Sequence, residues 1–121
     1  MMDLYRDNIL DHFRNPRNYG TLAGSATRVS QNNPSCGDSI TINIDLSQKG
    51  KIRAVSFTGT GCAVSMASAS MLTEFIKGKT STEVLALQKE DVERLLGLKL
   101  TLARIKCALL PLETIHQALH K

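Results

Sequence analysis

The feature that most constrains the fold is the segment ITINIDL, residues 40–46, in which isoleucine or leucine alternates strictly with polar residues. A hydrophobic period of two predicts a half-buried strand of an antiparallel sheet. The polar turn SQKGK follows, and IRAVSF, residues 52–57, predicts the strand that returns as its hairpin partner. A strand with a weaker signal is expected near residues 26–31. The centre of the chain is therefore predicted to form a small antiparallel sheet.

Segments with helical periodicity flank this sheet. Tyr5, Ile9 and Phe13 recur at four-residue intervals and predict a helix over residues 4–14 with one apolar stripe. After the sheet, residues 58–79 read TGTGCAVSMASASMLTEFIKGK, where two glycines lead into a helix whose small residues allow close packing. The expected order of helix, strands and then helices is that of an α+β domain.

The C-terminal third is predicted to be helical. Thr80 and Glu83 have the spacing of a capping box at the start of a short helix, and KEDVERLL predicts another helix. The segment ARIKCALLPLETIHQALHK predicts a long final helix. Because proline is tolerated only in the first turn of a helix, Pro111 places the expected start of this helix near Cys107 or Ala108.

The composition limits the class of protein. The chain has 121 residues, of which 42% are hydrophobic and 21% charged, as expected for one globular domain over residues 1–121. No apolar run approaches the roughly 20 residues of a membrane-spanning helix. The charged start is unlike a signal peptide, so a cytoplasmic location without a membrane partner is expected. The net charge is +4, but aromatic residues make up only 4% and no recognition motif is present, so nucleic-acid binding is not predicted.

Three cysteines carry the main functional signal. Cys36, Cys62 and Cys107 form an odd, widely spaced set without a CxxC pair, which in a reducing compartment favours metal or thiolate chemistry over disulfides. Cys36 is expected in the turn before the main strand. Cys62 is expected at a helix start, where the dipole favours the thiolate, and Cys107 at or near the start of the final helix. Three thiols at the ends of different elements can meet at one end of the sheet. The alternative for any single cysteine is that it is a small buried hydrophobic residue.

Asp38 and Lys106 complete the candidate site. In Cys-Gly-Asp, the glycine lets the turn bring both flanking side chains to one metal. Three thiols and one carboxylate suit tetrahedral zinc or the protein ligands of a [2Fe–2S] cluster. A carboxylate binds iron more weakly than a thiolate, which suits a site that releases its cluster. Each cysteine is a candidate sulfur acceptor, with Lys106 as an assisting cation. The structural alternative for Asp38 is a turn cap.

Four stretches of the chain carry distinctive motifs. They are DHFRNPRNYG (11–20), NNPSCGDSI (32–40), GTGCAVSMASASMLTEFIKGK (59–79) and RIKCALLPLETI (104–115). Together they resemble the IscU, SufU and NifU N-terminal family of iron–sulfur cluster assembly scaffolds over roughly residues 3–120. The resemblance implies the family's α+β fold, with a three-stranded antiparallel sheet packed against helices and a long C-terminal helix. It also implies that a cysteine desulfurase delivers persulfide sulfur and that the ligand set is Cys36, Asp38, Cys62 and Cys107.

The chain combines features of two branches of this family. In the IscU branch, a histidine usually precedes the last cysteine, and a Leu-Pro-Pro-Val-Lys motif recruits a specialised Hsp70 chaperone. This chain has Lys106 and the stretch LTLARIK at these places, so docking of that chaperone is not expected. Lys106 and SMASASM resemble the SufU branch. That branch typically carries an insertion between the second and third cysteines, which this chain lacks.

Three functions are compatible with the candidate site. The first is a scaffold that receives sulfur from a cysteine desulfurase, adds iron, builds a labile [2Fe–2S] cluster and passes it to apo acceptor proteins. The second is a zinc-dependent sulfur acceptor, a sulfurtransferase that stimulates a SufS-type desulfurase. The third is a structural zinc protein, which Asp38 disfavours because closed structural sites use cysteine and histidine. A monomer or a cluster-bridged oligomer is expected.

Overall fold

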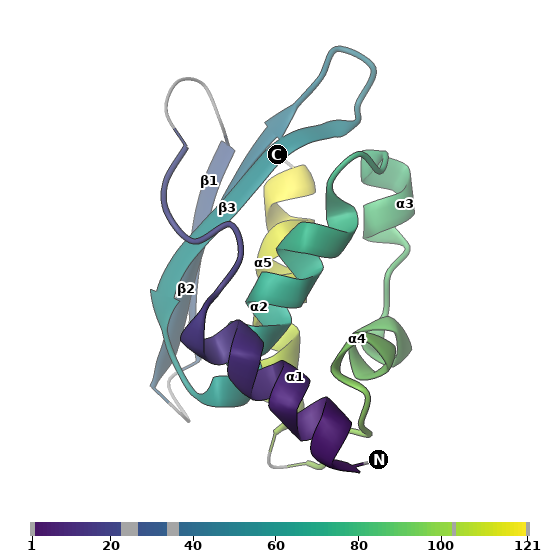
Figure 1. Ribbon diagram of the computed structural model, residues 1–121. Helices are drawn as coiled ribbons and strands as arrows, with labels where there is room; N and C mark the ends of the chain where they lie inside the picture. Colours follow the sequence, from purple (N-terminus) through teal and green to yellow (C-terminus); the bar gives the residue numbers. More distant parts are fainter. Residues whose placement is uncertain (1, 23–26, 34–36, 103, 121) are drawn as a thin grey trace.

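The computed structural model describes residues 2–22, 27–33, 37–102 and 104–120, with side chains from residue 7 onward. Within these ranges the chain forms one three-stranded sheet and five helices (Figure 1). Their order confirms the predicted α+β fold. The elements are α1 (Met2–Arg14), β1 (Thr27–Asn33), β2 (Asp38–Leu46), β3 (Ile52–Thr60), α2 (Ala63–Ile76), α3 (Ser81–Leu85), α4 (Lys89–Leu96) and α5 (Ile105–Leu119).

The sheet is antiparallel throughout, in the order β1-β2-β3. The pairing of β2 with β3 confirms the hairpin expected from ITINIDL and IRAVSF, with Ile42 opposite Phe57. β1 runs to Asn33, where it pairs with Asp38 at the start of β2. The alternating isoleucines of β2 all lie in the core, as their period of two predicts. They are Ile40, Ile42 and Ile44.

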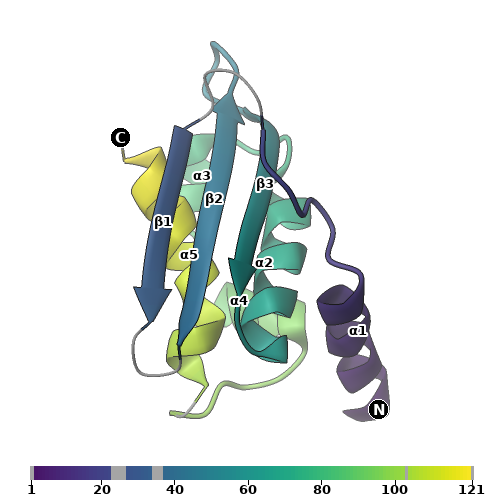
Figure 2. The ribbon, with the colours of Figure 1, turned by 90° about the vertical axis from the view of Figure 1, so that its left-hand side faces the viewer.

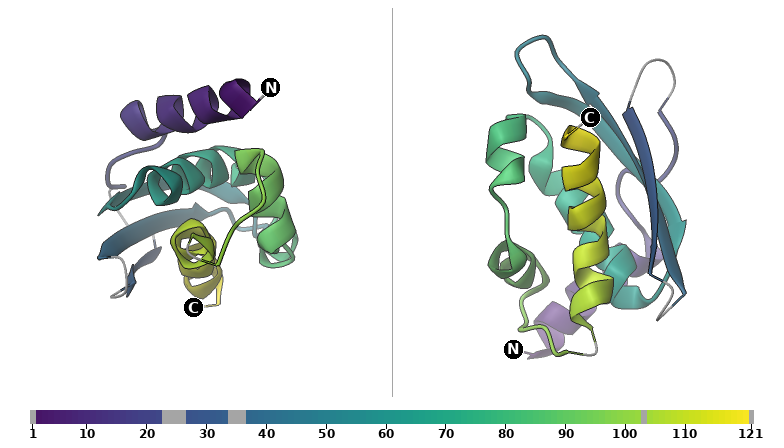
Figure 3. Two further views of the ribbon diagram at one scale, coloured as in Figure 1. Left: turned by 90° about the horizontal axis from the view of Figure 1, so that it is seen from below. Right: turned by 180° about the vertical axis from the view of Figure 1, so that it is seen from behind.

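Helices α2 and α5 cover one face of the sheet (Figure 2). Seen from below, α2 lies between α1 and the sheet (Figure 3). Nearly all residues of α2 are buried, and Ala67, Ala69 and Leu72 have no exposed surface. Its small residues let neighbours on several sides approach closely. α2 is therefore the central helix of the molecule.

Helix α1 docks on α2 through a polar contact. The hydroxyl of Ser70 accepts a hydrogen bond from the Arg17 amide at 2.8 Å and lies 2.7 Å from Nδ1 of His12. Ser70 thus joins the His12 imidazole of α1 and the backbone after α1 to the buried face of α2. This contact corrects the expected apolar stripe of α1: His12 is 7% exposed, whereas Phe13 is 40% exposed.

Helix α5 begins earlier than its proline suggests. It starts at Ile105, so Pro111 is its seventh residue and the expected start near residue 107 is wrong. Proline lacks the amide hydrogen that the helix uses at this position. The hydroxyl of Ser68 on α2 donates to the carbonyl of Ala108 at 2.7 Å. This bond ties the turn before Pro111 to α2, and sequence periodicity does not reveal it.

The short helices follow the predicted signals. Thr80 caps α3: its hydroxyl accepts from the Glu83 amide at 3.1 Å, and the Glu83 carboxylate accepts from the Thr80 amide at 3.0 Å. The segment KEDVERLL forms α4. Of the helices in the described ranges, none is both long enough and apolar enough to span a membrane.

Candidate metal centre

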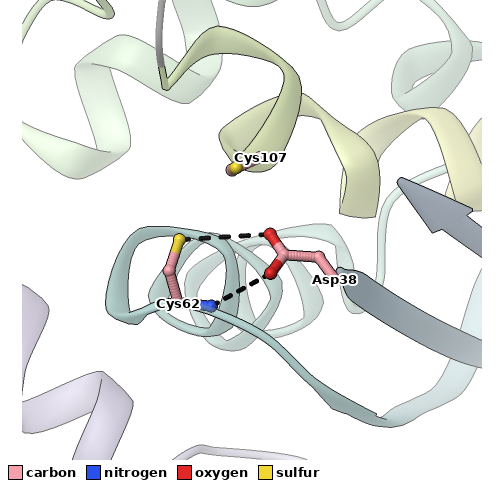
Figure 4. A group of neighbouring side chains, drawn as sticks. All are labelled: Asp38, Cys62 and Cys107. Atoms are coloured by element: carbon pink, nitrogen blue, oxygen red, sulfur yellow. Dashed lines mark hydrogen bonds between the residues drawn. The ribbon is translucent and has the colours of Figure 1, made fainter. Parts of the chain in front are cut away.

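Three side chains from three elements meet at one end of the sheet (Figure 4). Asp38 is the first residue of β2, Cys62 is the N-cap of α2, and Cys107 lies in the first turn of α5. One carboxylate oxygen and the two sulfurs lie within 4.8 Å of one another. Asp38 and Cys107 are buried, whereas Cys62 is exposed. The fold thus brings together three of the four residues that the sequence suggests as ligands.

The start of α2 orients the carboxylate of Asp38. Oδ1 accepts a hydrogen bond from the Cys62 amide at 3.2 Å, and Oδ2 lies 4.0 Å from Cys62 Sγ. The first N–H groups of a helix lack intrahelical acceptors, and a carboxylate at this end satisfies one of them. Asp38 therefore caps a distant helix with one oxygen and presents the other to a thiol. This arrangement suits a carboxylate that binds a metal through one oxygen.

The approach of Asp38 to α2 requires a glycine at position 61. A β-carbon on Gly61 would lie 2.9 Å from Asp38 Oδ1 and 2.4 Å from Ser65 Oγ. Ser65 in turn donates to the Cys62 carbonyl at 3.1 Å. Neither Gly61 nor Ser65 stands out in the sequence as part of a site. The three-residue spacing between Ser65 and the capping Cys62 is the signal that could have identified Ser65.

The donors fit a soft metal ion in kind and in spacing. A tetrahedral zinc ion with Zn–S bonds of about 2.3 Å places its ligand atoms about 3.8 Å apart. The three donor atoms already lie within 4.8 Å of one another, so small side-chain movements would close them around an ion. Two sulfurs and one carboxylate oxygen are ligands that zinc and iron both accept.

Cys36 lies outside the described residues, and along the chain it stands between Asn33 and Gly37. The two ends of this segment are joined, because the Gly37 amide donates to the Asn33 carbonyl at 2.9 Å. Gly37 has a φ of 73°, a left-handed conformation that glycine adopts without strain. The segment begins and ends beside Asp38, which pairs with Asn33.

Lys106 is exposed, and among the described residues it forms no ion pair with Asp38. It lines a surface hollow between β1 and α5. The hollow is lined by Gln31, Asn32, Asn33, Lys106, Leu110 and Glu113. Lys106 thus lies beside the end of β1 and directly precedes Cys107 in the sequence.

The chain is therefore an α+β domain in which one carboxylate and two thiols lie close together at the starts of β2, α2 and α5. The family described as NifU-like N terminal domain matches residues 4–121. The chain belongs to this family.

Two relatives represent the two branches of the family. The zinc-dependent sulfurtransferase SufU of Bacillus subtilis is 38% identical over 135 residues, covering 98% of this chain and 90% of the relative. The iron–sulfur cluster assembly scaffold protein IscU of Aquifex aeolicus is 41% identical over 117 residues, covering 95% and 73%. The alignment with SufU is longer than this chain, so SufU has residues without a counterpart here.

Solved structures of similar proteins share the fold. A crystal structure of a hypothetical protein has a TM-score of 0.88 at 32% identity and covers all of both chains. The putative iron–sulfur cluster assembly scaffold protein for the SUF system from Fervidobacterium islandicum has a TM-score of 0.82 at 29% identity, covering 93% of this chain and 94% of that one. The fold class implied by the resemblance is thereby confirmed.

Proposed function

We propose that this protein is an iron–sulfur cluster assembly scaffold, which holds a labile [2Fe–2S] cluster as cargo through Cys36, Asp38, Cys62 and Cys107. The observation that carries the proposal is the meeting of Asp38, Cys62 and Cys107 within 4.8 Å from three separate elements. The fourth ligand, Cys36, is two residues from Asp38 along the chain. The relatives named scaffold proteins support the same function.

The ligand set suits a cluster that is handed on. Thiolates are the usual protein ligands of iron–sulfur clusters, and a carboxylate is a harder and weaker ligand for iron. The exposed Cys62 gives the site a side open to solvent, while Asp38 and Cys107 lie behind it. A cluster held in this way can be approached by an apo acceptor protein and released through its weakest bond.

Sulfur delivery uses the cysteines as nucleophiles. A scaffold thiolate attacks the outer sulfur of a persulfide on a cysteine desulfurase. A new S–S bond forms on the scaffold, the donor S–S bond breaks, and the desulfurase cysteine leaves as a thiolate. The scaffold then carries the persulfide with its proton. Conversion of that sulfur to sulfide takes two electrons, supplied by a thiol or a reduced ferredoxin, before iron completes the cluster.

A second candidate function is a zinc-dependent sulfurtransferase that stimulates a SufS-type desulfurase. The relative of that name from Bacillus subtilis supports it, as does Lys106 beside Cys107. The donor set fits zinc, which would hold the ligands in place and lower the proton affinity of their thiols. This chain lacks the insertion between the second and third cysteines that is typical of the SufU branch, which favours the scaffold function.

The test is anaerobic reconstitution with iron, L-cysteine and a cysteine desulfurase, followed by visible absorption and Mössbauer spectroscopy with metal analysis. The scaffold function predicts a [2Fe–2S] species that passes to apo-ferredoxin and is lost in Cys36→Ser, Cys62→Ser and Cys107→Ser variants. If one zinc per chain remains bound, desulfurase turnover rises and no cluster forms, the sulfurtransferase function is correct and the scaffold function is wrong.

A further inference from the structure

The two edges of the sheet differ within the part of the chain that the structure describes. On β3, the Phe57 amide donates to the Asn18 carbonyl at 2.9 Å, and the Phe57 carbonyl accepts from the Gly20 amide at 2.8 Å. Ile52 is paired in the same way with residues 78–79. The segment after α1 thus runs along β3, whereas β1 forms the other edge of the sheet, with α5 behind it (Figure 2).

The register shows which backbone groups of β1 point outward. In an antiparallel sheet, the N–H and C=O groups of one residue point to the same side, and successive residues alternate. Phe57 points away from β2, so its partner Ile42 points towards β1 and bonds to Val29. The outward groups on β1 therefore belong to the residues that alternate with Val29. They are Arg28, Ser30 and Asn32.

The side chains of the same three residues lie on the solvent-facing side of the sheet. Arg28, Ser30 and Asn32 are exposed, whereas Val29 between them is buried. Among the described residues, no backbone group outside the sheet bonds to these three. Sheets commonly protect such an edge with a proline or a bulge. Over residues 27–33, β1 has neither, and its register with β2 is unbroken. An edge of this kind can pair with another extended chain.

This open edge of β1 leads directly to the metal centre. Its last residue, Asn33, pairs with Asp38. The hollow beside it is lined by Lys106 and Glu113, three side-chain amides and Leu110, so its lining is mixed and carries both signs of charge. The outward backbone groups of the edge require an extended partner, and Lys106 and Glu113 offer contacts to side chains of either charge. A strand that pairs along β1 has one end beside Asp38.

We propose that the open edge of β1 pairs with an extended, cysteine-bearing segment of the protein that donates sulfur, and so guides that cysteine to the metal centre. The proposal rests on the proposed function, in which sulfur arrives as a protein-bound persulfide. Residues 28–32 span about 13 Å of strand, enough for roughly five paired residues. Pairing of this length gives a contact that forms and dissociates readily, as a donor that must leave requires.

The test compares Ser30→Pro with Ser30→Ala. Both variants lose the hydroxyl and its 2.6 Å contact with Thr41 Oγ1, but only proline removes the outward N–H. Because this N–H is not part of the β1–β2 ladder, proline is tolerated at this edge position. With a SufS-type desulfurase and L-cysteine, we expect Ser30→Pro to lower kcat/KM for sulfur transfer roughly tenfold relative to Ser30→Ala. Equal values for the two variants overturn the proposal.

Three further measurements keep the result interpretable. Reconstitution with iron and inorganic sulfide bypasses the donor, so both variants should form the cluster at equal rates. If the wild-type protein forms no cluster from sulfide, the scaffold function fails, while the transfer rates still decide the role of the edge. If Ser30→Pro does not fold, Asn32→Pro against Asn32→Ala replaces it. If sedimentation shows a wild-type dimer that Ser30→Pro dissociates, the edge pairs with a second copy, and the donor proposal is overturned.

Discussion

Asp38 has two partners of different chemical kinds. One oxygen accepts from the Cys62 amide, and the other lies near the Cys62 thiol. The residue is nevertheless almost completely buried, with 4% of its surface exposed. A buried carboxylate is costly unless its lone pairs are satisfied, and the helix amide satisfies part of this need. The other oxygen remains available to an ion, which gives the carboxylate both a structural and a ligand role.

Replacing Asp38 by cysteine should make the assembled cluster longer-lived. A fourth thiolate binds iron more strongly than a carboxylate does. If the stronger ligand adds about 1.4 kcal/mol to cluster binding, the lifetime increases roughly tenfold. The measurement is the decay of visible absorption after reconstitution, in the presence of a chelator. Asp45→Cys, which adds a cysteine to the same strand away from the site, is the control. A lifetime of Asp38→Cys equal to or shorter than wild type contradicts the labile-ligand role.

The site was largely predictable at this scale because its chemistry lies in rare residue types. Asp38, Cys62 and Cys107 could be selected since cysteine is uncommon and Cys-Gly-Asp is a distinctive turn. Gly61 could not, because its role depends on how closely β2 approaches α2. A distance between two elements is a property of packing and has no local sequence signal.

Helix α3 depends on local hydrogen bonds more than on burial. It has five residues and only Val84 is buried, so its reciprocal capping box contributes a large share of its stability. The same bonds lower the pKa of Glu83 below its ordinary value, because the Thr80 amide and hydroxyl both donate to its carboxylate. The helix is thus specified almost entirely by two residues three positions apart.

Thr80→Ala should lower the free energy of unfolding by about 1 kcal/mol, the usual cost of removing an N-cap hydroxyl. Thr80→Ser keeps the hydroxyl and is the matched control. Urea unfolding monitored by circular dichroism measures the difference. Equal unfolding midpoints for the alanine and serine variants would show that the cap does not stabilise the folded chain.

Element boundaries were predictable where local signals decide them. The capping box and the alternating isoleucines are local signals, and both predictions are confirmed. Pro111 was misleading because contacts with α2 help to hold α5, such as the bond from the Ser68 hydroxyl to the Ala108 carbonyl, forty residues further along the chain. The expected burial of Phe13 was wrong for a similar reason. The apolar spacing pointed to Phe13, but Ser70 on α2 provides a partner for the imidazole.

The docking of α1 on α2 connects the stability of the whole molecule to pH. Burial lowers the pKa of His12 below its ordinary value of 6.5, and the charge of Arg17 adds to this effect. Glu74 and Asp11 act in the opposite direction but do not reverse it. The folded chain therefore resists protonation of His12 more than the unfolded chain does.

Stability should fall as the pH is lowered through 6.5 towards the lower pKa of folded His12. Above that range the imidazole is neutral in both states and contributes no pH dependence. Below it the unfolded chain binds the proton more readily, so unfolding becomes more favourable. His12→Asn should flatten the dependence of the urea midpoint between pH 7.5 and 5.5, whereas His120→Asn, at an exposed position, controls for the loss of one histidine. A wild-type slope in His12→Asn contradicts this assignment.

The three neighbouring donors belong to β2, α2 and α5, and their positions in the chain are far apart. An ion bound by all three is therefore a cross-link between the sheet and two helices, comparable to a disulfide that closes two long loops. An ion that binds the folded chain but not the unfolded chain stabilises the folded state by mass action. Loaded and empty protein consequently differ in rigidity as well as in cargo. Under the proposed function, this difference in rigidity is what would let an acceptor protein bind the loaded form in preference to the empty one.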